Sequence, residues 1–284
     1  MPPTAEAAGM ADHWVHHLDP VALHLWGPLA IRWYGLAYLA GLAWGWWMVQ
    51  RWSKAGRTPL TPPQVGDFVL AVGIGMIVGG RLGYCLLYGW HHVIADPLYI
   101  IRLYEGGMAS HGGILGMGIA AWWYGRKHRV DWGALADLVC ATAPLGVALG
   151  RAANFINGEL WGKPGDVPWA IIFPEAPLVD GQQVPRHPSQ LYEMLLEGFF
   201  LLAVIVQVHA RHRRPGFTTG VLLALYAVVR FVGEFWREPD LGHPPYWGWM
   251  NKGQLFSLPV LLAGIIIAVW AWRRGPRPDA YRSA

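Results

Sequence analysis

"WGALADLVCATAPLGVALGRAANFINGELWG" occupies residues 132–162, and its first part decides the fold of this chain. A helix needs about 20 predominantly apolar residues to cross a hydrocarbon core about 30 Å thick. Residues 132–150 approach that length and contain one charged residue, Asp137. The stretch therefore predicts a membrane-spanning helix that closes on a polar ending, GRAANFINGELWG, at residues 150–162.

The composition indicates an integral membrane protein, because 54% of the 284 residues are hydrophobic and only 14% are charged. The two cysteines, Cys85 and Cys140, lie in apolar runs and have neither a metal-ligand spacing nor a disulfide pattern. The first 31 residues lack Lys and Arg, so we do not expect a secretory signal peptide. The sequence has no DNA-binding motif, and no nucleic-acid partner is expected.

Six further apolar segments resemble the first in length. The seven candidate spans lie at roughly 30–50, 65–89, 108–125, 131–151, 188–209, 216–236 and 253–272. Residues 95–105 are too short to cross and are expected to form an interfacial helix, and residues 19–30 are also expected along the surface. The fold predicted is an all-α integral membrane protein, a bundle of seven transmembrane helices in one domain, 1–284.

Basic residues set the predicted orientation. Four segments that alternate with the spans hold 13 of the 22 Lys and Arg residues: 51–64, 126–130, 210–215 and the tail after 272. The positive-inside rule places these segments in the cytoplasm, so the amino terminus is outside and the carboxyl terminus is cytoplasmic. Residues 1–29 are then an extracytoplasmic arm, and the proline-rich loop 158–187 is expected to form a small extracytoplasmic cap.

Charged residues inside a span cost roughly 2.5–3.5 kcal/mol each on insertion scales, so they usually have partners or a task. Those within or near the end of a predicted span are Arg81, His111, Asp137, Arg151, Glu193, Glu197, Arg230 and Glu234. With a rise of about 1.5 Å per residue, Arg81 and Arg230 lie about 24 and 21 Å above the inner ends of their spans. Tyr34, His111 and Glu193 also fall in the outer half, which predicts a site near the outer leaflet.

Spacing adds local detail. Tyr226, Arg230 and Glu234 recur every four residues and share a helix face. Pairs of glycines four residues apart permit close helix packing. These pairs are Gly79–Gly83, Gly112–Gly116 and Gly146–Gly150.

Structural roles compete with functional ones. Arg81 is equally well explained as the partner of Glu193 or Glu197, and Glu234 is better explained as the partner of an arginine than as a catalytic group. Asn154 and Asn157 could bond the end of a helix. Three histidines at positions 13, 16 and 17 suggest a metal cluster, but no metal site is expected there.

Arg151 and Arg230 are harder to explain structurally. Two arginines at similar depth repel one another unless an anion joins them, and the guanidinium fork binds phosphate through two hydrogen bonds. In an outer leaflet the expected anion is a phospholipid head group.

Several motifs together resemble the prolipoprotein diacylglyceryl transferase family. They occur in family order over residues 25–272: RWYGLAYLAG at 32–41, GGRLGYCLLY at 79–88, EGGMASHGGILG at 105–116, GRAANFINGELWG at 150–162, RHPSQLYEMLLEG at 186–198 and RFVGEFWREPD at 230–240. One departure is Ala152-Ala153, where Leu-Gly is common in the family, and it leaves the polar positions intact.

The resemblance implies a seven-helix enzyme of the bacterial plasma (inner) membrane, with its active site toward the extracytoplasmic leaflet. The implied reaction moves a diacylglyceryl group from phosphatidylglycerol to the lipobox cysteine of a prolipoprotein signal peptide and releases glycerol 1-phosphate. The implied functional positions are Tyr34, His111, Asp137, Arg151, Asn154, Gly162, Tyr226 and Arg230.

Chemistry then suggests a role for each position. Arg151 and Arg230 are expected to stabilise the leaving phosphate, while Tyr226 and Asn154 orient the head group. His111 is the candidate general base for the substrate thiol; alternatively, it positions lipid while the field of the arginines acidifies the thiol. Tyr34 and Gly162 are expected to bind phosphatidylglycerol. Supporting roles are expected for Arg81, Asp137, Glu193, Glu197 and Glu234, and no metal or other cofactor is expected.

Two other classes stay open. A seven-helix anion transporter or channel would also bury arginines, although the polar residues here cluster in the outer half instead of running through the membrane. A lipid-binding scaffold without enzymatic activity is the third possibility. The enzyme hypothesis further predicts gaps between helices beside Arg151 and Arg230 for acyl chains, a second opening for the signal peptide, and peptide binding by loop 158–187.

Overall fold

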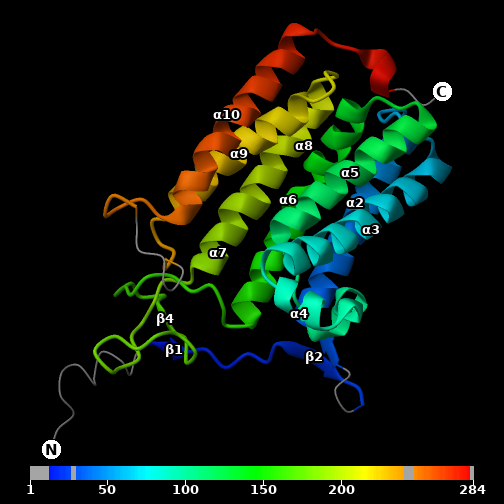
Figure 1. The fold of residues 1–284 in the computed structure, drawn as a ribbon. Coiled ribbons are helices and arrows are strands. Elements are labelled where there is room, and N and C mark those ends of the chain that lie inside the picture. Colours follow the sequence, from blue (N-terminus) through cyan, green and yellow to red (C-terminus); the bar gives the residue numbers. More distant parts are fainter. Residues whose placement is uncertain (1–12, 27–29, 240–245, 282–284) are drawn as a thin grey trace, which may run out of the picture. The chain divides into compact units, whose positions relative to one another are not determined.

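The structure is a computed structural model that describes residues 13–26, 30–239 and 246–281 (Figure 1). Long helices occupy all seven predicted segments. They are α2 (Trp33–Lys54), α3 (Pro62–Leu87), α5 (Ser110–His128), α6 (Trp132–Ile156), α7 (Ser189–Glu193) continued through η3 (Met194–Phe200) into α8 (Leu201–Arg211), α9 (Phe217–Gly233) and α10 (Lys252–Arg273). The chain is therefore a mostly helical protein, as predicted.

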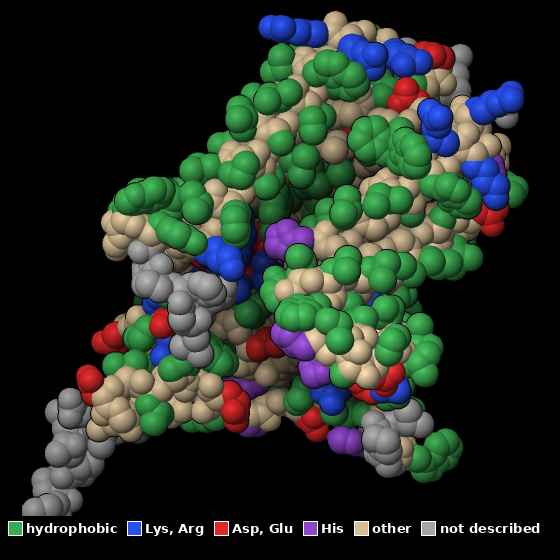
Figure 2. All heavy atoms as spheres, in the orientation of Figure 1, with side chains coloured by type: hydrophobic (Ala, Val, Ile, Leu, Met, Phe, Trp, Pro, Cys, Tyr) green, Lys and Arg blue, Asp and Glu red, His purple; other side chains and the backbone are tan. Residues whose placement is uncertain are grey.

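Four of the described helices are long and apolar enough to cross a membrane: Pro62–Leu87, Trp132–Ile156, Ser189–Arg211 and Lys252–Arg273. Their surfaces match that environment, because large apolar side chains such as Leu86, Leu195 and Ile266 are more than half exposed. Figure 2 shows hydrophobic side chains over much of the visible helix surface. The full count of seven spans and their orientation stay predictions.

Four short strands depart from the all-α prediction. Strand β2 (Val21–His24) pairs antiparallel with β3 (Ala30–Arg32), in the segment expected to lie along the surface. Strand β1 (Trp14–Val15) pairs in parallel with β4 (Ile171–Ile172) of the loop 158–187. The predicted arm is therefore tied to the predicted cap by backbone hydrogen bonds; residues 1–12 and 27–29 of the arm lie outside the described residues.

The chain divides into two compact units. The first unit comprises Met1–Gly41, Ala141–Val208 and Gly220–Val269, and the second comprises Leu42–Cys140, His209–Thr219 and Trp270–Ala284. Each unit is described by itself below.

In the second unit, α3 and α5 pack at backbone distance. Gly79 and Gly83 face Gly112 and Gly116, and a Cβ added to Gly83 would lie 2.9 Å from the Cα of Gly112. This packing confirms the prediction made from two of the three glycine patterns. The third pattern is confirmed in part, in the first unit: a Cβ added to Gly41 would lie 3.2 Å from the Cα of Gly146, whereas no neighbouring element of the described chain lies within 4 Å of the Cβ position of Gly150.

Three short helices join α3 to α5, where one interfacial helix was predicted. They are α4 (Trp90–Ala95), η1 (Pro97–Ile101) and η2 (Leu103–Glu105). Asp96 caps η1 by accepting a hydrogen bond from the Leu98 amide at 3.0 Å, and Pro97 fits the first position of that helix. The segment is thus broken into turns instead of forming one continuous helix.

The second unit also holds the final helix of the described chain, η4 (Pro278–Tyr281). The hydroxyl of Tyr281 donates to Asp137 at 2.7 Å, and both residues are buried. Asp137 also accepts from the amides of Gly216 and Thr219 at 3.0 and 2.8 Å, and so caps the start of α9.

Candidate active site

Arg151 lies within α6, because this helix continues past the predicted end to Ile156. Its Nε is 3.1 Å from Glu193 Oε2, and its Nη2 is 2.9 Å from Glu197 Oε2. Both carboxylates are buried, whereas 16% of the Arg151 side chain stays exposed. The anionic partners of Arg151 are therefore buried within the protein, and part of the arginine side chain remains accessible.

The two glutamates come from the α7–η3–α8 helix, which contains a π-helical segment at Met194–Phe200. Sequence periodicity correctly puts Glu193 and Glu197 on one face, but it has no signal for the wider turn. Gly198 packs against α6 here, since a Cβ at this position would lie 2.7 Å from the Cα of Ala148. Close packing of the two helices brings the glutamates to Arg151.

Arg230 of α9 meets the same two carboxylates. Its Nη1 is 2.7 Å from Glu193 Oε1 and 3.2 Å from Glu197 Oε1, and its Nη2 donates to Glu234 one turn later. The side chain is 15% exposed. Tyr226, one turn before Arg230, interacts electrostatically with Arg151 and Arg230.

Sequence reasoning missed a third arginine in this cluster. Arg237 lies just beyond the predicted span 216–236, yet its Nη1 is 3.2 Å from Glu193 Oε1 and its Nε is 3.9 Å from Glu234 Oε1. Its place three residues after Glu234 was the available signal. We call Arg151, Arg230, Arg237, Glu193, Glu197 and Glu234 the charge cluster.

The charge cluster corrects one step of the sequence argument. Arg151 and Arg230 were expected to require a lipid phosphate between them, but Glu193 and Glu197 already supply the opposing charge. Three arginines and three glutamates balance formally. Buried ion pairs survive only when most donors and acceptors are satisfied, and this network satisfies that condition for the glutamates.

The ending of α6 is held by a second network in the same unit. Asn154 is buried, and its Nδ2 donates to the Tyr34 hydroxyl and to Glu159 Oε1, the latter at 2.8 Å. Asn157 donates to the same Glu159 oxygen at 3.3 Å. Glu159 therefore joins Asn154 to Asn157, and Tyr34 connects the network to α2.

Gly162 lies where three segments meet. Its amide donates to the His187 carbonyl at 2.9 Å, and a Cβ would lie 2.6 Å from the Trp236 carbonyl oxygen. Its carbonyl accepts from Arg186 Nη1 at 3.3 Å. A larger residue would collide with the His187 and Trp236 backbone and would push these segments apart.

The second unit holds the other predicted site residues. His111 is exposed near the start of α5. The predicted pairing of Arg81 with Glu193 or Glu197 is wrong, because every guanidinium donor of Arg81 is bonded to a backbone carbonyl. Asp137 is buried at the start of α9, as described above. The structure thus brings together Tyr34 with Asn154, and Arg151 with Arg230 and Tyr226.

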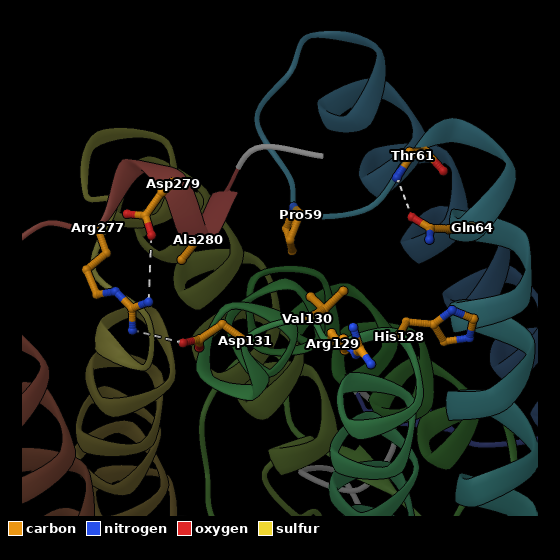
Figure 3. Close-up of a pocket in the computed structure, with 10 residues that line it drawn as sticks. All are labelled: Pro59, Thr61, Gln64, His128, Arg129, Val130, Asp131, Arg277, Asp279 and Ala280. Atoms are coloured by element: carbon orange, nitrogen blue, oxygen red, sulfur yellow. Dashed lines mark hydrogen bonds and ion pairs between the residues drawn. The ribbon is translucent and has the colours of Figure 1, made fainter. Parts of the chain in front are cut away.

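One pocket of about 280 Å³ lies in the second unit, and Figure 3 shows its lining. Arg277 points toward Asp131 at 3.2 Å and toward Asp279 at 3.7 Å, while Arg129 and His128 lie on the α5–α6 turn. The pocket contains none of the predicted site residues.

Apolar helices long enough to cross a membrane and a buried charge cluster define a helical membrane protein with a polar site built on its helices. The family model described as prolipoprotein diacylglyceryl transferase matches residues 20–270, and the chain belongs to this family.

Similar proteins carry a consistent name. A Pseudomonas syringae pv. syringae strain B728a protein named phosphatidylglycerol–prolipoprotein diacylglyceryl transferase is 45% identical over 262 residues, 91% of this chain and 95% of the relative. A protein of the same name from Pseudomonas fluorescens strain SBW25 is 46% identical over 264 residues, 92% of this chain and 96% of the relative.

Proposed function

We propose that this chain is a phosphatidylglycerol–prolipoprotein diacylglyceryl transferase. It transfers the diacylglyceryl group of phosphatidylglycerol to the lipobox cysteine thiol of a prolipoprotein, forms a thioether and releases glycerol 1-phosphate. This is the first step of bacterial lipoprotein maturation. Family membership over residues 20–270 and the names of relatives about 45% identical support the proposal.

The observation in this chain that carries the proposal is the arrangement of Arg151 and Arg230. Glu193 and Glu197 are buried behind them, while the two arginine side chains stay 16% and 15% exposed. Within the described residues, Arg151 Nη1 and Arg230 Nε form no hydrogen bond, so both groups keep a donor for an incoming anion. A phosphate with several acceptor oxygens matches these donors.

The reaction is a substitution at a glycerol carbon. A carbon–sulfur bond forms, the carbon–oxygen bond to phosphate breaks, and its electron pair moves to the phosphate oxygen. Arg151 and Arg230 are proposed to stabilise this growing charge, because fixed donors in a water-poor site do so without reorganisation. Asn154, Tyr34 and Tyr226 orient the head group, and Gly162 contributes to the binding site.

The attacking thiol must lose its proton, since free cysteine has a pKa of about 8.5. His111 is proposed as the general base. The alternative is that His111 positions the lipid and the arginines acidify the thiol. Arg81, Asp137, Glu193, Glu197 and Glu234 have supporting roles.

We further propose the membrane arrangement. The chain is one domain of seven spans in the bacterial inner membrane, with its amino terminus outside and its carboxyl terminus in the cytoplasm. The active site faces the extracytoplasmic leaflet, with the arm 1–29 and the cap 158–187 on that side. Acyl chains enter through gaps between helices beside Arg151 and Arg230, and the signal peptide uses a second opening and contacts the cap.

The test incubates purified protein in vesicles with phosphatidylglycerol and a lipobox peptide. Mass spectrometry should find the diacylglyceryl thioether, together with released glycerol phosphate. Arg151→Ala and Arg230→Ala should each reduce turnover by about 100-fold or more, the usual cost of losing a donor to a developing anion. Arg277→Gln, an exposed arginine of the second unit, is the matched control. Folded protein that forms no thioether would refute the enzyme and favour the transporter or the scaffold.

A further inference from the structure

Arg81 of α3 is held by backbone carbonyls alone. The guanidinium group has five N–H donors, and each donates to a carbonyl between residues 99 and 107. Nε donates to Ile100 at 3.0 Å, Nη1 to Gly106 and to Gly107 at 3.2 Å, and Nη2 to Tyr99 and to Arg102 at 3.0 Å. We call these five carbonyls the carbonyl cage.

This arrangement is unusual for a buried cation. Arg81 is 2% exposed, and no carboxylate pairs with it among the described residues. The Tyr99 ring lies 4.5 Å from its guanidinium carbon and adds a cation–π contact. A buried charge without an opposite charge is expensive unless its hydrogen bonds are complete, so all five bonds are needed.

The carbonyl cage comes from a segment with little regular structure of its own. Two short 3₁₀ helices, η1 and η2, end within it, and carbonyl oxygens near the ends of short helices keep a lone pair that can accept a further hydrogen bond. Gly106 and Gly107 then take φ of 79° and 80°, a conformation that favours glycine and turns both carbonyls toward Arg81. Without the guanidinium, the carbonyls of Gly106 and Gly107 would lose this donor, whereas those of Tyr99 and Arg102 would each keep a backbone amide at 3.2 Å.

The same segment leads directly into α5. After Gly107, the amide of Ala109 donates to the Gly80 carbonyl at 2.9 Å, and α5 begins at Ser110, one residue before His111. Adjacent residues of α3, Gly80 and Arg81, therefore hold both the segment and the first turn of the next helix.

We propose that Arg81 is a positioning residue for His111: its guanidinium gathers the carbonyl cage and so fixes the start of α5. The proposal rests on the proposed function insofar as His111 takes part in the reaction. Lysine cannot replace arginine here, because an ammonium group has at most three donors for the five acceptors.

The experiment compares wild-type protein with Arg81→Lys, Arg81→Met and the control Arg102→Gln. The control breaks the ion pairs of Arg102 with Asp96 and Glu105 in the same segment but leaves the carbonyl cage intact. Amide hydrogen exchange of residues 99–111 reports the order of the segment without reference to activity. Exchange of α6, α9 and α10 reports whether each variant is folded, and the lipobox-peptide assay gives kcat and KM for phosphatidylglycerol.

For both Arg81 variants we expect faster exchange confined to residues 99–111 and a kcat lower by between about tenfold and 100-fold, with KM changed much less. Arg102→Gln should show neither effect. If amide exchange of residues 99–111 is unchanged in Arg81→Met, Arg81 does not order this segment and the proposal is wrong. If exchange becomes faster but kcat is unchanged, the segment does not position His111 for the reaction. If Arg81→Met does not fold, Arg81→Lys decides by the same criteria. Wild-type protein without transferase activity would refute the proposed function, while the exchange result would still test the carbonyl cage.

Discussion

A single carboxylate oxygen of Glu197 accepts two hydrogen bonds from Arg151: Oε2 lies 3.2 Å from Nε and 2.9 Å from Nη2. The other oxygen, Oε1, is thereby left for Arg230 at 3.2 Å. One carboxylate thus fixes two arginines from different helices, α6 and α9. Their separation is set by the protein before any anionic substrate arrives, and such preorganisation is what makes fixed donors effective in catalysis.

Replacing Glu197 with Gln should therefore damage both folding and activity. The amide keeps the shape but removes the charge that faces two buried arginines, and breaking a buried ion pair from one side costs about 3–5 kcal/mol. Thermal unfolding in detergent should show a clearly lower midpoint, and turnover at a permissive temperature should fall. Glu105→Gln, in a partly exposed pair, is the control. A Glu197→Gln protein with wild-type stability would contradict the view that this carboxylate neutralises Arg151.

The Asn154 network predicts a different outcome, because it contains no ion pair. Asn154→Ala removes the donor to the Tyr34 hydroxyl and leaves Glu159 Oε1 with only the bond from Asn157 at 3.3 Å, and an unsatisfied buried group costs about 1–3 kcal/mol. If the same free energy is lost from stabilisation of the transition state, kcat/KM falls by about tenfold or more. Tyr34→Phe should have a smaller effect, since Asn154 keeps Glu159. Kinetics with the lipobox peptide would measure both, and equal losses would show that Asn154 acts mainly through Tyr34.

Close helix packing can be tested with two glycines. Gly83→Ala places a methyl group 2.9 Å from the Cα of Gly112, where only backbone can yield, and overpacking of this kind costs about 1–3 kcal/mol. Gly118→Ala, on α5, meets nothing within 4 Å and should be neutral or slightly stabilising. Unfolding midpoints of the two variants give the comparison. Equal midpoints would show that α3 and α5 tolerate separation.

The sequence sufficed to locate the helices and to select several of the polar residues that the structure brings together, for reasons that these residues illustrate. Hydropathy located the seven long helices of the described residues, because long apolar runs with few charges can be recognised without knowledge of tertiary contacts. Glycine spacing identified the contact of α3 with α5, since small residues there have few other uses. Motif resemblance selected Arg151, Asn154, Tyr226 and Arg230.

The sequence could not predict which groups the buried arginines contact, because these contacts depend on how each helix is rotated in three dimensions. The structural alternative for Arg81 paired it with Glu193 or Glu197, but its guanidinium donates to backbone carbonyls. Arg237 lies just beyond the predicted span 216–236, and yet it pairs with Glu193. Charge and depth alone cannot tell a carboxylate partner from a carbonyl partner. The pairing of β1 with β4 involves residues more than 150 positions apart and only two residues in each strand, which leaves no local pattern to detect.

Tyr281 should make stability depend on alkaline pH. Burial and the charge of Asp137 raise the pKa of Tyr281 above its ordinary value. A hydroxyl with a raised folded-state pKa contributes stability that is complete below the unfolded value of about 10 and is lost as the pH rises above it. The unfolding free energy of wild-type protein should therefore drop more steeply above about pH 10 than that of Tyr281→Phe. Denaturant unfolding at several pH values measures the difference, and parallel curves would exclude the contribution of this hydroxyl.

His16 should make the attachment of the amino-terminal arm sensitive to acid. Its Nε2 bonds the Phe155 carbonyl at 2.7 Å, and its amide donates to Ile172 at 2.8 Å. Burial lowers the pKa of His16 from 6.5, although the bond to Phe155 acts in the opposite direction. The unfolded arm therefore binds a proton more readily than the docked arm, so docking is strongest above about pH 6.5 and weakens as the pH falls below it.

Hydrogen exchange, corrected for its intrinsic pH dependence, should then show loss of protection at the His16 amide between pH 7 and about pH 5. His16→Gln keeps a side-chain donor but cannot titrate in this range, so its protection should change little with pH. His17→Gln removes an exposed neighbour that also lowers the pKa of His16, so the acid-induced loss of protection should persist in this variant and begin at a slightly higher pH. Acid-induced loss of protection that persists in His16→Gln would assign the pH dependence to another group of the arm.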